Sequence, residues 1–166
     1  MIKLVIFDMS DVTTTNEETP YVDRYARDHN LDPREFSEYY LSILPRAEIG
    51  EITGHDVWRE LLAKFGIKDD VDRIVREMAS GKDVVQEVLD FAKALRSKVK
   101  TAFLTNYSKA YWDAIIERLD FKPYFDYGLV SYQIKARKPA EEGFRHILDH
   151  FNVKPEEAVY TDDNPK

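Results

Sequence analysis

The sequence lacks cysteine altogether, and glycine and proline are scarce, with 6 and 7 residues among 166. The absence of cysteine excludes disulfides, thiolate metal sites and cysteine nucleophiles. No stretch approaches the ~18 consecutive apolar residues of a membrane-spanning helix. Met1-Ile2-Lys3 leads straight into a strand-like run instead of a signal peptide. We therefore expect a cytoplasmic protein with no membrane association.

Positively charged residues are also fewer than negatively charged ones. The sequence has 24 Lys and Arg and 31 Asp and Glu, so the formal net charge is −7. Nucleic acids and anionic membrane surfaces bind clustered positive charge. Since the sequence contains no basic block, we expect neither as a partner. The net charge does not exclude a small anionic substrate, which needs only a few local donors.

Hydrophobic residues make up 43% of the chain and aromatic residues 13%, which is enough for one domain with a substantial core. Short apolar runs at 2–7, 101–105, 128–131 and 158–161 predict buried strands. From residue 81 onward these runs alternate with helical patterns, as is typical of parallel β-α units. The predicted fold class is therefore α/β.

The stretch between the first two predicted strands is helical. Apolar side chains recur at helical spacing around Trp58, and Gly66 suits a left-handed helix cap. We therefore assign residues 16–80 to an inserted helical cap. Residues 1–15 and 81–166 then form the core that carries the sheet.

Polar side chains follow the predicted strands. Asp8 and Thr105 end two of them, Asp162-Asp163 follow the last, and Lys138 lies in the loop after the third. Ligands bind at the carboxyl ends of parallel strands, so we expect one shared site. Two carboxylates ~4 Å apart repel by ~4 kcal/mol at an effective dielectric constant of about 20. The cluster therefore needs a cation or shifted pKa values. Oxygen ligands favour Mg²⁺, and such a site favours nucleophilic attack on phosphate.

Four motifs occur in order at or near the strand ends. They are Phe7-Asp8-Met9-Ser10-Asp11-Val12, Leu104-Thr105-Asn106, Lys138-Pro139 with Phe144, and Tyr160-Thr161-Asp162-Asp163-Asn164. Together with the cap segment Gly50-Glu51-Ile52-Thr53 they resemble the haloacid dehalogenase (HAD) superfamily, in particular its helical-cap subgroup that includes sugar-phosphate phosphatases of the glucose-1-phosphate type. The resemblance covers nearly the whole chain. It implies a three-layer, Rossmann-like parallel sheet with a helical cap inserted after the first strand.

The resemblance implies a Mg²⁺-dependent phosphomonoester hydrolase that acts on a small phosphorylated metabolite. In such an enzyme Asp8 is the nucleophile that forms an aspartyl-phosphate, and Lys138 balances the charge of Asp8 and the phosphate. Thr105, Asn106 and Lys138 bind the phosphate, although Asn106 could instead cap the following helix. The implied Mg²⁺ ligands are Asp8, the backbone carbonyl of Ser10, Asp162 and Asp163.

The sequence departs from the family pattern at Ser10, where phosphatases of the family carry a general acid/base aspartate. Serine does not protonate a leaving group at neutral pH, and such catalysis is typically worth ~10²–10⁴-fold. Turnover would then need good leaving groups, as in relatives that also lack this aspartate, or Asp11 would take the role. The alternatives are a catalytically weak or inactive phosphate-binding or interaction protein and, less favoured, a 2-haloacid dehalogenase. Dehalogenases lack the acidic pair of the fourth motif.

The chain stops at Lys166, directly after the fourth motif, whereas the family core continues with a further helix and strand. We therefore expect either a truncated chain or a fourth strand left as an open sheet edge, through which an oligomer could form. The substrate stays open, because its identity depends on the cap and the loops.

Overall fold

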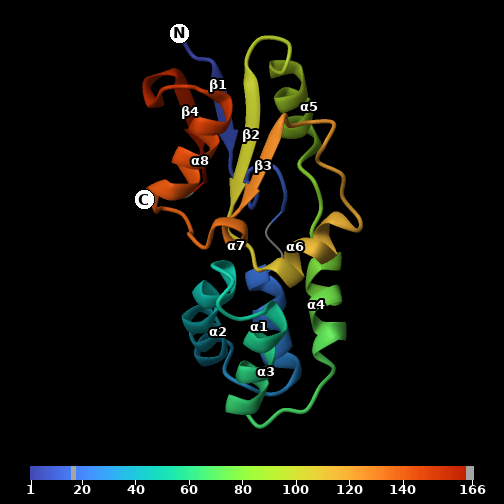
Figure 1. Ribbon diagram of the computed structural model, residues 1–166. Helices are drawn as coiled ribbons and strands as arrows, with labels where there is room; N and C mark the ends of the chain where they lie inside the picture. Colours follow the sequence, from blue (N-terminus) through green and yellow to red (C-terminus); the bar gives the residue numbers. More distant parts are fainter. Residues whose placement is uncertain (16–17, 164–166) are drawn as a thin grey trace.

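The computed structural model describes residues 1–15 and 18–163 (Figure 1). Its strands are β1 (Leu4–Phe7), β2 (Lys100–Thr105), β3 (Tyr127–Val130) and β4 (Ala158–Thr161). They form one parallel sheet in the order β3-β2-β1-β4. Each strand lies within a few residues of its predicted position, and the α/β fold class is confirmed.

Helices cover both faces of the sheet, which makes three layers. On one face, Leu104 belongs to a buried cluster with side chains of α8 (Glu141–Phe151). On the other face, Phe103 packs against α6 (Lys109–Ile116), and α5 (Gln86–Leu95) contacts the same strand. Successive strand residues point to opposite faces. Burial on both faces therefore explains the nearly uninterrupted apolar runs of these strands.

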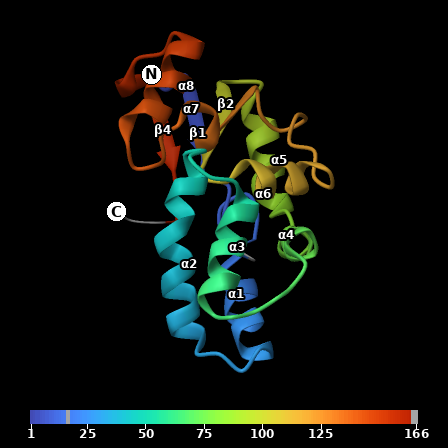
Figure 2. The same cartoon turned by 60° about the horizontal axis from the view of Figure 1, so that its bottom comes forward.

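The first four described helices after β1 pack together beside the carboxyl ends of the strands (Figures 1 and 2). They are α1 (Glu18–Asp28), α2 (Pro33–Glu48), α3 (Gly54–Lys64) and α4 (Val71–Ser80). At their centre, Trp58 packs against four rings, those of Tyr21, Tyr25, Phe36 and Tyr40. A large aromatic side chain buries about 150–250 Å², so this cluster is a main source of the packing energy that joins the helices.

Local sequence signals set the ends of these helices. The side chains of Asp32, Thr53 and Asp70 accept hydrogen bonds from backbone N–H groups in the first turns of α2, α3 and α4. These bonds satisfy donors that a helix leaves unpaired at its start. Gly66, with φ +68°, has the left-handed conformation predicted for it just after α3.

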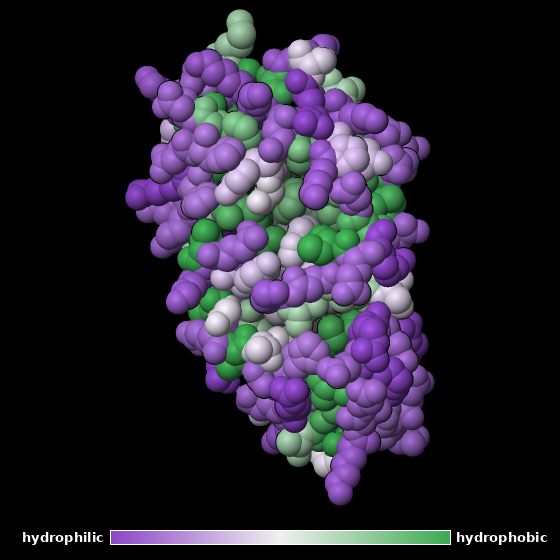
Figure 3. Space-filling model, turned by 45° about the vertical axis from the view of Figure 1, so that its right-hand side comes forward, coloured by the Kyte–Doolittle hydropathy of each residue, from purple (hydrophilic) through white to green (hydrophobic). Residues whose placement is uncertain are grey.

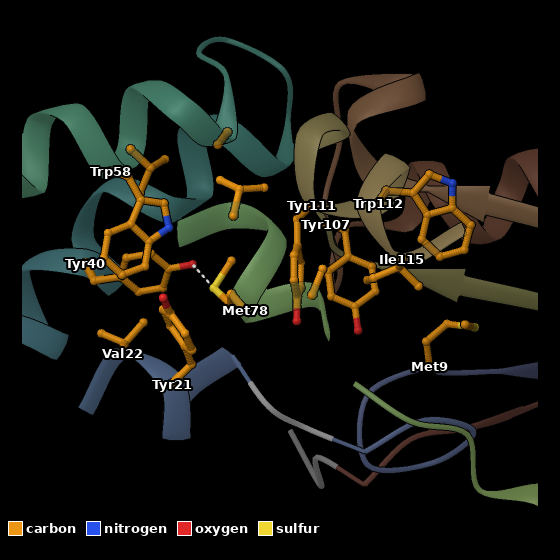
Figure 4. Packing of buried hydrophobic residues seen from close by; sticks show 14 of the residues in the cluster. Met9, Tyr21, Val22, Tyr40, Trp58, Met78, Tyr107, Tyr111, Trp112 and Ile115 are labelled. Atoms are coloured by element: carbon orange, nitrogen blue, oxygen red, sulfur yellow. Dashed lines mark hydrogen bonds between the residues drawn. The ribbon is translucent and has the colours of Figure 1, made fainter. Parts of the chain in front are cut away.

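The buried aromatic cluster continues from these helices into the layer that covers the sheet (Figure 4). α4 packs against α6, and Tyr111 of α6 belongs to the same cluster as Trp58 of α3. Helices α1 to α4 therefore share part of their core with the rest of the molecule. The division of the chain into core and cap stays a prediction.

The structure differs from the sequence prediction just after β3. The apolar run predicts a strand that extends to Ser131, but Ser131 begins the one-turn helix α7 (Ser131–Ile134), which is too short to show a helical pattern. The Ser131 hydroxyl donates to the Glu48 carbonyl oxygen at 2.6 Å and accepts from the Tyr107 N–H at 3.2 Å. Tertiary hydrogen bonds therefore hold this turn. Asn164 of the fourth predicted motif lies outside the described residues.

Apolar side chains on the face shown in Figure 3 lie in small groups between hydrophilic ones. Within the described chain, no helix is long and apolar enough to span a membrane.

β4 is at one edge of the described sheet and pairs with β1. Association through this edge stays a prediction.

A close contact in the sheet gives a test of the packing. Gly128 in β3 lies against the ring of Phe103, and a Cβ atom at Gly128 would come within 2.1 Å of that ring. We expect Gly128→Ala to lower the free energy of unfolding by about 1–3 kcal/mol, because the ring must move within a packed core. Urea unfolding followed by circular dichroism measures the change. Phe103→Leu in the same background should recover part of the loss, and a simply additive loss would contradict the account.

Candidate active site

A cavity of about 560 Å³ lies at the carboxyl ends of the strands and reaches α1 and α2. All of the predicted site residues line it, namely Asp8, Ser10, Thr105, Asn106, Lys138, Asp162 and Asp163. Helices α1 and α2 add Glu18, Tyr40 and Glu48. The fold therefore brings residues from four separate strand-end segments to one place, as the parallel topology predicts.

The Lys138 ammonium group joins two carboxylates in this cavity. Its Nζ lies 2.6 Å from Asp8 Oδ1 and 3.0 Å from Asp162 Oδ2. It also lies 2.7 Å from the Tyr160 hydroxyl, which donates a hydrogen bond to Asp162. The side chains of Lys138, Asp8 and Asp162 are 13%, 9% and 18% exposed. Solvent screens charges at such depth weakly, so these contacts are stronger than those of a surface ion pair.

Asp8 follows β1 and is buried. Burial raises the pKa of its carboxyl group above the usual value, while Lys138 and the Met9 N–H group oppose the rise. The Met9 N–H donates to Oδ1 at 2.6 Å, which is the oxygen that Lys138 contacts. Both donors thus bind the same oxygen of the carboxylate, and the ionised form gains from any further positive charge nearby.

Asp8, Asp162 and Asp163 form a cluster in which one oxygen of each carboxylate lies within 4.8 Å of the others. Carboxylates this close repel one another. Lys138 contacts two of them, so its one positive charge leaves the cluster negative. Carboxylate oxygens are ligands that Mg²⁺ prefers, and Asp163 is exposed. The donor set therefore fits a hard divalent cation that enters from solvent.

Asn106 holds the main chain at Lys138. Its Nδ2 donates to the Lys138 carbonyl oxygen at 3.2 Å, and its Oδ1 accepts from the Lys138 N–H at 2.9 Å. The N-cap of α6 is Ser108, so the alternative that Asn106 caps this helix is wrong. Thr105, the last residue of β2, is buried and also lines the cavity.

Two residues that no motif indicates surround Ser10. The Tyr107 hydroxyl lies 2.5 Å from Ser10 Oγ, and Lys82 Nζ lies 3.3 Å from it. Lys82 is 1% exposed. In the sequence it follows Ser80-Gly81, which looks like an ordinary helix end, so nothing marks this lysine as buried. Tyr107 directly follows the second motif, and that proximity is the one signal that could have found it.

The part of the cavity wall that comes from α1 and α2 is also charged. Tyr40 donates to Glu18 Oε1 at 2.5 Å, and Arg137 Nε lies 2.7 Å from Glu48 Oε2. Burial raises the pKa of Glu18, and it raises the pKa of Glu48 to about 7 although Arg137 opposes the rise. Sequence patterns do not reveal these two carboxylates, because each occupies an ordinary helix position until the fold brings it to the cavity.

Comparison with known proteins identifies the family. The family model of the haloacid dehalogenase-like hydrolases matches residues 2–166. The chain belongs to the haloacid dehalogenase-like hydrolases. It is 28% identical over 173 residues to a phosphorylated carbohydrates phosphatase of Thermotoga maritima, across 98% of this chain and 77% of that relative. The family predicted from the four motifs is confirmed.

Solved structures share the fold of this HAD-like hydrolase at low sequence identity. A HAD family enzyme from Bacteroides thetaiotaomicron has a TM-score of 0.82 at 20% identity, across 99% of this chain and 85% of that chain. Its complex with magnesium and inorganic phosphate has a TM-score of 0.79 at 20% identity, across 99% and 86%. L-2-haloacid dehalogenase from Xanthobacter autotrophicus has a TM-score of 0.65 at 17% identity, across 96% and 69%. These similarities concern the fold alone.

Glu48 makes the stability of the HAD-like hydrolase depend on pH. Its pKa is about 7 in the folded protein and about 4.3 in an unfolded chain. Between these two pH values Glu48 is protonated in the folded state and ionised in the unfolded state. The free energy of unfolding therefore falls as the pH rises from about 4.3 to about 7, by at most about 4 kcal/mol. We expect Glu48→Gln to lack this loss. Urea unfolding near pH 5 and near pH 8 measures it.

The matched control is Glu142→Gln, at an exposed position of α8. This variant should keep the pH dependence of the wild-type protein. If Glu48→Gln also keeps it in full, the Glu48 carboxyl group does not titrate in this range.

Proposed function

We propose that the protein is a Mg²⁺-dependent phosphatase that cleaves a small phosphorylated metabolite through an aspartyl-phosphate on Asp8. The observation that carries the proposal is the contact of Lys138 with both Asp8 and Asp162. Through this contact the buried Asp8 carboxylate is oriented beside the carboxylates of Asp162 and Asp163. A carboxylate nucleophile needs that orientation and a partly balanced charge. The name of the Thermotoga maritima relative supports the same class of reaction.

Asp8 attacks the phosphorus atom of the ester. Because the Met9 N–H and Lys138 both bind Oδ1, we assign the attack to Oδ2. A bond forms between Oδ2 and phosphorus while the bond from phosphorus to the ester oxygen breaks, and the alcohol portion leaves with the electron pair. Water then cleaves the aspartyl-phosphate, which releases inorganic phosphate and restores the Asp8 carboxylate.

The metal ligands that we assign are Asp8, the Ser10 carbonyl oxygen, Asp162 and Asp163. The spacing of the three carboxylates supports this set. A bound Mg²⁺ supplies positive charge to the phosphoryl oxygens. Asp162 contacts Lys138 and would also be a ligand of the metal.

We assign the phosphate group to Thr105, Asn106 and Lys138, which line the cavity beside the nucleophile. Lys138 contributes its positive charge beside the phosphate. Asn106 already bonds to the Lys138 main chain in both directions. Its contribution therefore includes the placement of that lysine.

The substrate class that we propose is a phosphorylated carbohydrate. Tyr40, Glu18, Glu48 and Arg137 line the same cavity and provide both donors and acceptors of hydrogen bonds. Groups of this kind match the hydroxyls of a sugar. The relative named as a phosphorylated carbohydrates phosphatase supports this choice.

Ser10 favours a second candidate, a HAD-like protein that binds phosphate and metal with little or no turnover, because general acid catalysis by an aspartate is absent at this position. Dehalogenation is less favoured, since the three-carboxylate cluster calls for a cation. Hydrolysis of phosphate esters separates the first two candidates.

The nucleophile assignment is tested by Asp8→Asn. We expect hydrolysis of p-nitrophenyl phosphate to fall by at least about 10³-fold, because the amide is a poor nucleophile. Asp149→Asn, at an exposed position of α8, should keep the wild-type rate. Undiminished turnover by folded Asp8→Asn protein would overturn the assignment. Absence of turnover in the wild-type protein, with any ester of a sugar-phosphate panel, would favour the phosphate-binding candidate.

The metal assignment is tested by thermal unfolding in EDTA and in Mg²⁺. A cation that binds the folded state stabilises it by about 2.7 kcal/mol at 100 times its Kd, so we expect Mg²⁺ to raise the melting temperature and EDTA to stop turnover. Asp163→Asn should lose most of the stabilisation, whereas Asp149→Asn should retain it. An equal rise in both variants would contradict the role of Asp163 as a ligand.

A further inference from the structure

We infer that the Ser10 hydroxyl donates a hydrogen bond to the leaving-group oxygen, and that Lys82 and Tyr107 are positioning residues that direct its proton into the cavity. The inference rests on the proposed phosphatase function. It gives position 10 a task that a serine can perform, which is to stabilise developing negative charge without itself becoming ionised.

The hydrogen bonds around Ser10 support this orientation. A hydroxyl group has one proton to donate and two lone pairs that accept. Lys82 Nζ, which can only donate, lies 3.3 Å from Ser10 Oγ. The Tyr107 hydroxyl lies 2.5 Å from the same atom and also hydrogen bonds to the Thr14 side chain. We assign its proton to Ser10, because a phenol is a stronger acid than an aliphatic alcohol. With both lone pairs of Ser10 occupied, its own proton is available to the cavity that Ser10 lines.

The surroundings hold Lys82 in place behind Ser10. Its Nζ donates to the Thr15 carbonyl oxygen at 2.5 Å and to Thr14 Oγ1 at 3.3 Å. It also lies 5.3 Å from the centre of the Tyr107 ring. Lys82 is 1% exposed, so its charge acts through a poorly screened interior. A hydroxyl that accepts bonds from an ammonium and a phenol becomes a better donor, because hydrogen bonds in a chain strengthen one another.

The step balances without a proton from the protein. The bond between Asp8 Oδ2 and phosphorus forms, the bond from phosphorus to the ester oxygen breaks, and the electron pair stays on that oxygen. Ser10 O–H hydrogen bonds to it as the charge develops. A water molecule then protonates the leaving group, and the hydroxide that remains attacks the aspartyl-phosphate. One water is consumed overall, as hydrolysis requires.

The test compares three esters of similar size: p-nitrophenyl phosphate, phenyl phosphate and benzyl phosphate. Their leaving groups carry increasingly localised negative charge in that order. A hydrogen bond to a charged group corresponds to about 10- to 150-fold in rate. We expect Ser10→Ala to lower kcat for benzyl phosphate within that range and for p-nitrophenyl phosphate by less than about 3-fold, with phenyl phosphate between them. Ser10→Thr, which keeps the hydroxyl, should restore most of the benzyl phosphate rate.

Tyr107→Phe tests the positioning role. It should reproduce the same order of losses among the three esters, and combining it with Ser10→Ala should cost little more than Ser10→Ala alone, because the two act through one hydrogen bond. A purely structural role for Tyr107 predicts losses that are equal for all three esters and that add to those of Ser10→Ala. Ser97→Ala, an exposed serine, is the matched control and should leave all three rates unchanged.

The outcomes separate the inference from the function on which it rests. If Asp8→Asn abolishes turnover but Ser10→Ala slows the three esters equally, or slows none of them, the inference is overturned and the phosphatase stands. If the wild-type protein hydrolyses none of the esters, the phosphatase proposal fails and the inference fails with it.

Discussion

One ammonium group organises the candidate active site. The parallel sheet delivers the ends of β1 and β4 to the same edge, which brings the Asp8 and Asp162 carboxylates together in a poorly screened interior. Lys138 contacts both of them. Without this positive charge, burial would favour the protonated, unreactive form of Asp8. The Asn106 amide fixes the main chain at Lys138, so the loops after β2 and β3 cooperate to place that charge.

The sequence predicts this part of the site well, for a physical reason. Asp8, Thr105 and Asp162 stand at the ends of short apolar runs, and the parallel sheet turns that position in the chain into a position in space. Lys138 lies in a loop, where the third motif identifies it, and its role is predicted from the resemblance to a known family. The prediction of these residues depends only on the correct order of the strands, and it does not depend on the detailed packing of any helix.

Helix patterns carry less information about the other side of the cavity. The spacing of apolar residues in α1 and α2 predicts which face of each helix is buried, but it does not indicate what that face meets. Glu18 and Glu48 reach the cavity through the packing of α2 against α1 and α7. Lys82 is equally hidden in the sequence, because its buried position depends on contacts with the loop at Thr14 and Thr15.

Shared packing also decides how the molecule comes apart. Local unfolding requires a region whose stabilising contacts are mostly internal to it. Helices α1 to α4 lack that independence, because the buried cluster runs from Trp58 to Tyr111 and α4 packs against α6. We therefore expect these helices to unfold together with the layer that covers the sheet. We expect proteases that cleave unfolded segments to cut these helices only when α6 opens as well.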